Sequence, residues 1–566
     1  MDSQRLVITS ALAVVAYLLV LAWNEDYGQP VSQQRDQVTS DQVTTLHGES
    51  ESNELPASKD APADLPSAES PQAQSLPLQP AQQPNQLISV ETDTLIIQID
   101  PRGGDVVRAA LKKYPMTLGK PDVPFVVLEQ SNQVTYIAQS GLVGLNGPDA
   151  SNKGRPVYTS SQNSYVMEDG KDNLVVDLML IDASGVTITK RFTFVRGNYL
   201  MDIDFIINNQ SSGNWQGNFF AQLKRDNSSD PSQTTSMGMS SFLGAATTTE
   251  NDPYTKIAFS DFSDDPLKEK MTGGWIAILQ HYFLSAWIPD KSELYTYQTR
   301  KSGNGDNIAG LIGQKVTIAP SETRVIKAQL FVGPKIQNRL AEISPGLELT
   351  VDYGWLWFIA QPLFWLLTKL HGFVGNWGWA IVLTTLAVKL LFFHLSATSY
   401  RSMANMRRVG PEMQRLKTLH GDDKQKLSAS VMALYKKEKI NPLGGCLPIL
   451  VQMPVFIALY WVLLESVELR HAPFALWITD LSVKDPYFIL PILMGGSMFI
   501  QQTLNPEPPD PMQARIMKIL PIMFTFFFLW FPAGLVLYWV VNNLLSIAQQ
   551  WVITRQIENA GKIKPT

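Results

Sequence analysis

Long apolar segments constrain the fold of this chain more than any other feature of its sequence. The first covers residues 6–23 and would form a helix about 27 Å long, close to the roughly 30 Å of hydrocarbon in a bilayer. Five more lie towards the C-terminus. We therefore predict a polytopic α-helical membrane protein with six transmembrane helices. The five C-terminal segments are residues 377–395, 446–465, 487–504, 516–531 and 534–551.

The N-terminal segment has two interpretations, an uncleaved signal anchor and a cleaved signal peptide. It is long for the apolar region of a signal peptide, and Asn24, Glu25 and Asp26 stand where a cleavage site needs small residues. We therefore predict a signal-anchor helix within residues 1–24. Residues 25–88 are rich in Gln, Ser, Pro and acidic residues and cannot bury enough apolar surface to fold, so we predict a disordered linker.

Residues 89–345 show the period-two alternation of β-strands. In residues 186–195 apolar residues and Lys190 alternate with a set made mostly of threonine, and residues 199–207 repeat the pattern. Turn-forming sequences such as residues 182–185 separate the strands. Many short strands joined by turns predict a large all-β sandwich.

Charge is distributed unevenly along the chain. Residues 25–351 carry 26 Lys and Arg against 38 Asp and Glu, a net charge of −12, whereas residues 396–445 carry 10 against 4, a net charge of +6. Basic loops of membrane proteins stay in the cytoplasm. The sequence therefore predicts cytoplasmic N- and C-termini, a cytoplasmic tail at residues 552–566, and a β domain in the periplasm.

Residues 352–371, rich in Trp and Leu, are predicted to form an interfacial amphipathic helix. If they spanned the membrane, the basic loop and the acidic β domain would lie on the same side, against the charge rule. Within the basic loop, residues 397–440 predict a helical hairpin, because two sets of apolar residues at helical spacing flank a turn and N-cap at residues 420–423. The hairpin methionines fit either its core or a docking surface, and its charge fits either a topology signal or contact with a ribosome.

Lys389 lies inside a predicted span, and Thr385 lies one turn before it on the same face. A lysine at the centre of a membrane helix costs about 2.5–3.5 kcal/mol, so such residues usually line polar cavities. Alternatively, the lysine stem could extend so that its ammonium reaches the cytoplasmic interface. The neighbouring Thr385 favours a polar cavity.

The last predicted span carries a polar stripe at spacings of 4, 4 and 3 residues, which places its members on one helical face. Hydrogen bonding between helices is the simpler explanation of such a stripe. Gln452 adds a further polar group from another span. Together these residues predict a substrate groove with one cation. The stripe consists of Tyr538, Asn542, Ser546 and Gln549.

Several classes of function are disfavoured. The predicted spans hold no carboxylate, since Glu465 and Glu468 lie at or beyond a span end, which argues against a proton-coupled transporter. No Gly-x-x-x-x-Gly-Lys-Ser/Thr loop is present. His281 has no paired ligand in the β domain, and the single cysteine, Cys446, excludes an internal disulfide. We predict no catalytic residue, cofactor or metal site, and a protein that is not an enzyme.

Long motifs in the C-terminal part resemble the YidC/Oxa insertase family, and the large β domain resembles its Gram-negative branch. The motifs are residues 441–448 (NPLGGCLP), 452–456 (QMPVF), 466–470 (SVELR), 472–478 (APFALWI), 485–487 (DPY) and 531–539 (FPAGLVLYW).

This resemblance implies a bacterial inner-membrane protein whose helical core, residues 377–551, encloses a hydrophilic groove open to the cytoplasm and to lipid. Lys389 matches the groove cation, which is arginine in the family, so the planar bidentate fork is lost while the charge is kept. Thr385 and Tyr538 match other groove positions. The β domain resembles the supersandwich of sugar mutarotases, but without a histidine pair no sugar chemistry is implied.

The resemblance also implies the partners: nascent membrane proteins such as small phage-coat-like proteins and ATP synthase subunit c, the Sec translocon SecYEG, SecDF, the ribosome and the lipid bilayer. The implied function is that of an insertase and chaperone that acts alone or with the translocon. Two alternatives remain on the residues alone, a small-anion transporter and a structural platform for Sec assembly.

Overall fold

The computed structural model describes residue 66 and residues 86–150, 154–233, 241–420, 423–438, 447–505 and 511–561. The predicted signal anchor, almost all of the predicted linker and Cys446 lie outside the described residues.

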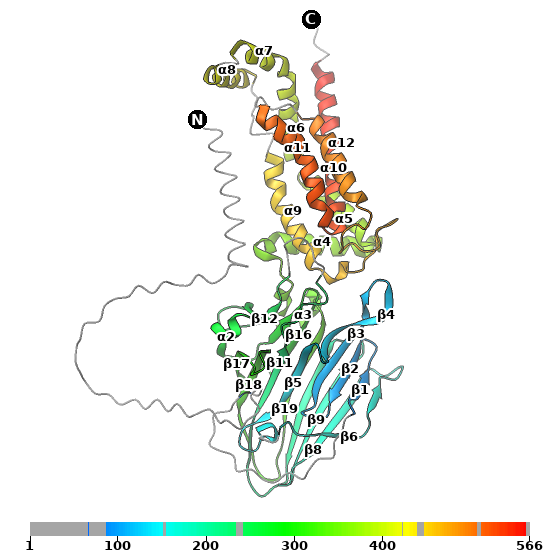
Figure 1. Ribbon diagram of the computed structural model, residues 1–566, viewed down its shortest axis with the longest axis vertical. Helices are drawn as coiled ribbons and strands as arrows, with labels where there is room; N and C mark the ends of the chain where they lie inside the picture. The colour runs from blue at the N-terminus through cyan, green and yellow to red at the C-terminus, as the bar shows by residue number, and fades with distance from the viewer. Residues whose placement is uncertain are drawn as a thin grey trace, which may run out of the picture. The chain divides into compact units, whose positions relative to one another are not determined.

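The β domain is a sandwich of two large sheets (Figure 1). Among the strands that the structure describes, all pairs are antiparallel except β1 with β7. The first sheet has the order β14 (Lys268–Thr272), β17 (Leu294–Lys301), β18 (Asn307–Ile318), β11 (Trp215–Arg225), β5 (Thr135–Val143), β4 (Lys120–Gln130), β3 (Asp105–Thr117), β2 (Leu95–Asp100), β1 (Ile88–Glu91) and β7 (Ser164–Val166). The second has the order β13 (Thr255–Ala258), β12 (Gly244–Thr247), β15 (Ile276–Leu279), β16 (Phe283–Pro289), β19 (Thr323–Pro334), β10 (Leu200–Asn209), β9 (Val186–Val195), β8 (Asn173–Ile181) and β6 (Thr159–Ser160).

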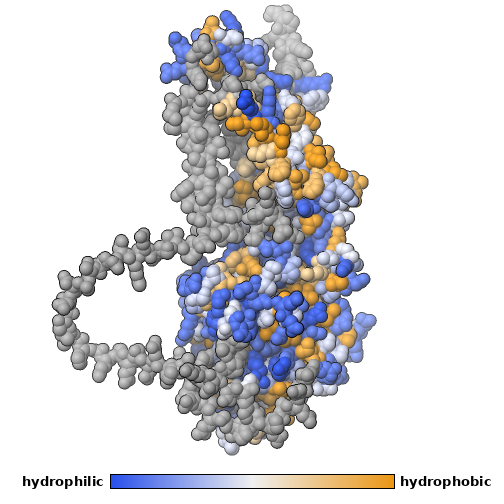
Figure 2. Space-filling model, in the orientation of Figure 1, coloured by the Kyte–Doolittle hydropathy of each residue, from blue (hydrophilic) through white to orange (hydrophobic). Residues whose placement is uncertain are grey.

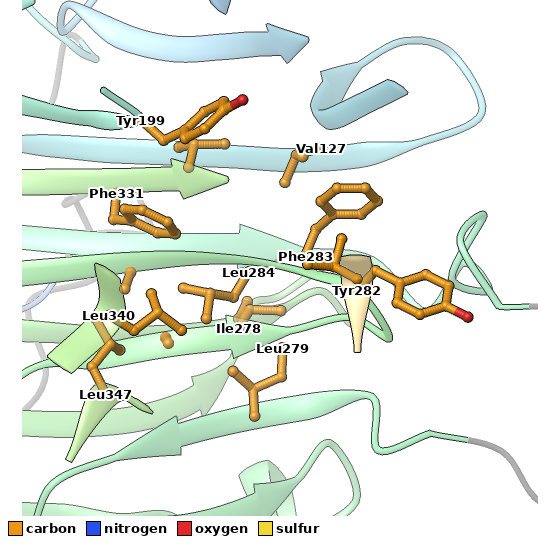
Figure 3. Packing of buried hydrophobic residues seen from close by; sticks show 14 of the residues in the cluster. Val127, Tyr199, Ile278, Leu279, Tyr282, Phe283, Leu284, Phe331, Leu340 and Leu347 are labelled. Atoms are coloured by element: carbon orange, nitrogen blue, oxygen red, sulfur yellow. The ribbon is translucent and has the colours of Figure 1, made fainter. Parts of the chain in front are cut away.

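The alternation predicted from the sequence is confirmed in β9 and β10. Every second residue of both strands is buried, and Ile203 of β10 pairs with Phe192 of β9 across the sheet. Large apolar side chains fill the space between the sheets; for example, the rings of Phe125 and Phe283 stack with centroids 4.3 Å apart. Figure 3 shows how Phe283 and its neighbours pack. The predicted β-sandwich is therefore confirmed.

A buried lysine links the two sheets of the sandwich. Lys190 of β9 is fully buried, and its ammonium donates hydrogen bonds to the carbonyl oxygens of Gly103, Gly104 and Ser140 at 3.0, 2.8 and 3.0 Å. These carbonyls belong to the turn between β2 and β3 and to β5, in the first sheet. One charged side chain thus ties both layers together.

One more cation and two carboxylates belong to the charged cluster around Lys190. The guanidinium of Arg155 lies 2.7 Å from a carboxylate oxygen of Asp105 and 2.9 Å from one of Asp149. Asp149 also accepts a hydrogen bond from the backbone N–H of Leu142 at 2.8 Å. The cluster therefore contains two cations and two carboxylates, which makes the burial of these charges tolerable.

We expect the substitution Lys190→Met to remove a pH dependence of stability. Burial lowers the pKa of Lys190 to about 7, whereas a lysine in the unfolded chain titrates near 10.4. Below pH 7 Lys190 is protonated in both the folded and the unfolded chain, so the free-energy cost of burying the charged ammonium lowers the stability in full. Between these pKa values only the unfolded chain holds it, so the free energy of unfolding of the parent rises with pH. The difference between the two pKa values corresponds to an expected rise of about 3–5 kcal/mol.

Pulse proteolysis of the full chain in urea at several pH values between 6 and 10 measures this effect as the difference between parent and variant. The difference should change with pH because Met cannot titrate. A constant difference over that range would contradict the prediction.

The helical part follows the sandwich and contains nine helices of eleven residues or more among the described residues. Short helices connect them or interrupt the sandwich: η1 (Pro148–Ala150), α2 (Asp261–Asp264), α3 (Gln337–Ile343), η2 (Leu347–Thr350), η3 (Gly354–Leu356), η5 (Val467–Leu469) and η6 (Phe528–Trp530). The longer helices are α4 (Trp357–Val374), α5 (Trp377–Leu391), α6 (Phe393–Arg408), α7 (Gly410–His420), α8 (Lys424–Lys437), α9 (Leu447–Glu465), α10 (Ile489–Thr503), α11 (Pro511–Phe527) and α12 (Ala533–Gly561).

The helix α4 corresponds to the predicted interfacial helix but starts later and ends later than residues 352–371. It starts after the 3-10 turn η3 and ends where Gly375, at φ 64°, takes the left-handed conformation that glycine adopts at helix ends. One face, with Leu363 and Leu367, is buried, and α4 packs against α5 and α9. The other face exposes Trp357, Phe358, Trp365 and Phe373.

The first predicted core span, residues 377–395, is divided at Phe392. The helices α5 and α6 meet there at 68°, although residues 388–396 hold no proline or glycine that would predict a bend. Among the described residues, no single helix is both long and apolar enough to cross a bilayer. The bent α5–α6 pair, taken together, is long and apolar enough by length and composition. The count of six spans stays a prediction.

The described part of the predicted hairpin, residues 397–440, contains the end of α6 followed by α7 and α8, with no loop between α6 and α7. The carboxylate of Asp423 caps α8 by accepting hydrogen bonds from the backbone N–H groups of Gln425 and Lys426, both at 3.1 Å. Met406 and Met413 pack on the buried residues of the hairpin, so these two methionines belong to its core.

The sandwich and the helical part share a buried ion pair. The ammonium of Lys335, just after β19, lies 3.2 Å from a carboxylate oxygen of Glu465, the last residue of α9, and both side chains are only 4% exposed. The hydroxyl of Ser241 donates to the same carboxylate at 3.0 Å. Further on, the guanidinium of Arg470 donates to the carbonyl oxygen of Pro115 in β3 at 2.9 Å. The end of α9 is thus joined to the sandwich by polar contacts.

Candidate functional site: a polar cluster in the helical core

The cation predicted from the sequence lies where three helices meet. Lys389, in the last turn of α5, is 9% exposed. Its ammonium donates to the hydroxyl oxygen of Ser546 in α12 at 2.7 Å and lies 3.4 Å from the amide oxygen of Gln452 in α9. The lysine therefore points into the bundle, and the alternative of an extended stem reaching the interface does not describe this structure.

The remaining groups form a short hydrogen-bonded chain. The amide nitrogen of Gln452 donates to the side-chain oxygen of Asn542. The Ser546 hydroxyl in turn donates to the carbonyl oxygen of Asn542 at 2.7 Å. No described carboxylate pairs with Lys389, so its partners are all neutral. Four of the predicted site residues are thus brought together: Lys389, Gln452, Asn542 and Ser546.

Thr385 and Tyr538 take different positions, and so does Gln549 of the predicted stripe, whose amide nitrogen donates to the carbonyl oxygen of Phe393 at 3.2 Å. The hydroxyl of Thr385 donates to the carbonyl oxygen of Ile381, one turn earlier in its own helix, at 2.7 Å. Tyr538 is 1% exposed, and its ring stacks on Phe456 of α9 with centroids 6.1 Å apart. Both are buried in the same bundle, but no direct hydrogen bond joins either to Lys389.

The structure also shows polar contacts that the sequence analysis missed. Asn543 donates to the hydroxyl of Ser497 in α10 at 3.0 Å, and Gln550 donates to the side chain of Asn505 at 3.0 Å. Asn543 and Gln550 are seven residues apart and therefore share a face of α12. The same periodicity argument that found the first stripe would have found this one.

Two family models together match most of the chain. One, described as "YidC periplasmic domain", matches residues 87–366, and the other, "60Kd inner membrane protein", matches residues 369–560. The membrane protein insertase YidC of Pseudomonas aeruginosa is 55% identical over 99% of this chain and 100% of its own length. That of Azotobacter vinelandii is 56% identical over 100% of both. The chain belongs to the YidC family of membrane protein insertases.

The YidC resemblance predicted from the motifs is thereby confirmed. Among solved structures, an active YidC insertase with its first transmembrane domain resolved aligns with 82% of this chain and 92% of its own, at 17% identity and a TM-score of 0.37. A galactose mutarotase related enzyme from Lactobacillus acidophilus aligns with 44% of this chain and 97% of its own, at 9% identity and a TM-score of 0.31.

The polar cluster of this YidC-family chain lies among helices that expose many apolar side chains. Figure 2 shows apolar side chains gathered over the helical part and polar ones over the α7–α8 hairpin and much of the sandwich. Contiguous exposed apolar side chains of this kind mark contact with lipid or protein. The exposed apolar residues of α10 and α11 include Ile492, Leu493, Phe499, Ile500, Ile516, Ile519, Ile522, Met523 and Phe526.

The histidine of the β domain has a structural role. His281 is 2% exposed, its Nε2 lies 3.0 Å from the carbonyl oxygen of Leu464, and its ring stacks on Tyr282. Burial lowers the pKa of His281 and keeps the ring neutral. Within the described ranges, no group of three His, Cys, Asp or Glu side chains could hold a metal ion.

Proposed function

We propose that this chain is a membrane protein insertase and chaperone that inserts inner-membrane proteins and helps them to fold and assemble, without covalent chemistry. The observation that carries the proposal is the buried cation Lys389, held by the neutral oxygens of Ser546 and Gln452. A cation inside a helical bundle with neutral partners attracts a carboxylate that comes near it, because Coulomb attraction is strong where water is excluded.

The polar cluster would act by lowering a barrier. Moving an unpaired polar group from water into hydrocarbon costs several kcal/mol. A polar groove partway into the membrane shortens that transfer, and Lys389 gives an acidic flank a favourable place to wait. The net driving force would come from the substrate itself, at about 0.8 kcal/mol for each methylene that its own span buries.

We further propose where the groove opens, how the chain crosses the membrane and how substrates reach it. The groove would open to the cytoplasm and to lipid, the chain would span the membrane six times with both termini in the cytoplasm, and the sandwich would lie in the periplasm. Substrates would arrive from ribosomes, directly or through SecYEG and SecDF. The groove residues would be Lys389, Thr385, Gln452, Tyr538, Asn542 and Ser546.

Proteoliposomes that contain the purified full chain and no Sec components test this proposal. The substrate is a small single-span protein with an acidic tail, and the measurement is the amount of fragment protected from external protease. We expect the protected fragment to form at least roughly tenfold faster than in empty liposomes, which corresponds to a barrier lowered by about 1.4 kcal/mol.

The same liposomes are assayed for flux of small anions. Anion flux without insertion would indicate that the chain is a transporter and not an insertase. Neither flux nor insertion by correctly folded protein would favour a structural platform for Sec assembly. Either result contradicts the proposal.

A further inference from the structure

A cavity of about 580 Å³ opens at one end of the nine-stranded sheet of the sandwich. Its floor is formed by the neighbouring strands β10 and β19, including Phe331. Its walls are the helix α3 and the turns between β9 and β10 and between β16 and β17. Figure 3 shows Tyr199 and Phe331 at this end of the core, with Leu340 of α3 nearby. A cavity of this size can hold a small polar ligand.

The cavity has an excess of positive charge. Three cations line it, Arg196, Lys291 and Arg339, against one carboxylate, that of Glu342. Among the described residues none of the three cations forms an ion pair with a carboxylate. Asp93 lies close by, but its carboxylate already accepts from the backbone N–H of Gly197 and lies 3.9 Å from the ammonium of Lys113.

The two arginines are positioned by backbone carbonyls. Arg196 donates through Nε and Nη2 to the carbonyl oxygens of Lys171 and Glu168 at 2.9 and 2.7 Å. Arg339 donates through Nη1 to the carbonyl oxygen of Gly197 at 3.1 Å, which joins α3 to the turn before β10. These contacts orient the side chains without neutralising their charge.

Two neutral donors complete the site. The side-chain oxygen of Asn198 accepts from the backbone N–H groups of Tyr199 and Leu200 at 2.8 and 3.2 Å, which leaves its amide nitrogen as a donor. Burial raises the pKa of Tyr199 to about 12, so its hydroxyl also stays protonated. Arginines with additional neutral donors are the groups that proteins use to bind phosphate.

The cavity lies close to the end of the helical core. Pro334 and Ile336, which line it, flank Lys335, whose ammonium pairs with Glu465 at the end of α9. The chain continues from α3 into α4, whose exposed tryptophans are the residue type found at lipid headgroup depth. If α4 lies in the interface, as the sequence predicts, a phosphate bound here would be near the headgroups.

We infer that this cavity is a binding site for the phosphate of an anionic phospholipid headgroup. The site goes beyond the proposed insertase function, because it lies in the sandwich and shares no residue with the polar cluster around Lys389. It holds the sandwich against the membrane surface by a charged contact with lipid.

Native mass spectrometry of the full chain in detergent micelles, titrated with phosphatidylglycerol, tests this inference. The variants are Arg196→Gln/Arg339→Gln and, because the double change could disturb α3, the single change Lys291→Gln in an exposed turn. The matched control is Lys315→Gln/Arg324→Gln, which removes two surface charges outside the cavity. We expect one binding event to weaken at least tenfold in the double variant and to weaken in Lys291→Gln, with no change in the control. Comparing lipid binding by the parent and the variants separates lipid bound in the cavity from lipid bound to the helices.

Competitors identify the source of the phosphate. Phosphatidylcholine should bind this site more weakly than phosphatidylglycerol, and inorganic phosphate at equal concentration should not displace the lipid. Displacement by inorganic phosphate would overturn the lipid source, and displacement by a hexaglutamate peptide would make the cavity a peptide site. Equal lipid binding by the parent and both cavity variants would overturn the site itself. Because the measurement is lipid binding, its outcome is independent of the insertion assay.

Discussion

Sec-independent insertion of an acidic-tailed substrate is expected to fall roughly a hundredfold when Lys389 is replaced by glutamate. Two unit charges about 5 Å apart at an effective dielectric constant of about 20 interact by roughly 3 kcal/mol, so loss of the attraction alone corresponds to a fall of roughly a hundredfold, and repulsion by the glutamate can only add to it. The present partners of the ammonium, Ser546 and Gln452, both offer it oxygen atoms. The measurement is the initial rate at which protected fragment forms in proteoliposomes.

Three controls separate charge from folding. Lys389→Arg restores the cation and should retain insertion. Lys369→Glu makes the same charge reversal at an exposed position of α4, outside the cluster, and should leave the rate unchanged. A substrate with a neutral tail should be inserted equally by the parent and by Lys389→Glu. Equal insertion of the acidic substrate by both would keep the insertase and remove the charge from its mechanism.

Breaking the ion pair between sandwich and helices should cause the largest loss of stability. In Lys335→Met, the carboxylate of Glu465 stays buried without its cation, a situation that costs about 3–5 kcal/mol. The hydroxyl of Ser241 remains as a donor but carries no charge. Urea titration of the full chain, followed by pulse proteolysis, measures the change in the free energy of unfolding.

The double variant Lys335→Met/Glu465→Leu is the informative comparison. Replacing both members of a buried pair by apolar residues is often neutral, so it should recover most of the stability that the single variant loses. Arg102→Met breaks an exposed pair with Asp100 and should cost no more than about 1 kcal/mol. A single variant as stable as Arg102→Met would show that the pair contributes little.

The sandwich could be predicted from the sequence because some of its strands, such as β9 and β10, are half-buried and alternate strictly. In β9 this pattern even placed Lys190 on the inward face, where the structure has it. The bend between α5 and α6 could not be predicted, since no proline or glycine marks Phe392. The ion pair of Lys335 with Glu465 joins residues 130 positions apart, and a single sequence contains no signal for such a contact.

The candidate site was predicted from helical periodicity and from the cost of a charge in the membrane. These arguments identified Lys389, Gln452, Asn542 and Ser546 as neighbours, as the structure shows. Periodicity gives the face of a helix but not the direction of a hydroxyl, which explains why Thr385 bonds to its own helix instead. The role of these residues in insertion stays a prediction.

Side-chain hydrogen bonds join the helix α12 to its neighbours on two sides. One side meets Lys389 of α5 and Gln452 of α9, and the other meets Ser497 at the middle of α10 and Asn505 beyond its end. Turning or sliding α12 as a rigid rod would break hydrogen bonds on both sides at once. We therefore expect α12 to move least among the helices of the bundle when its neighbours are displaced.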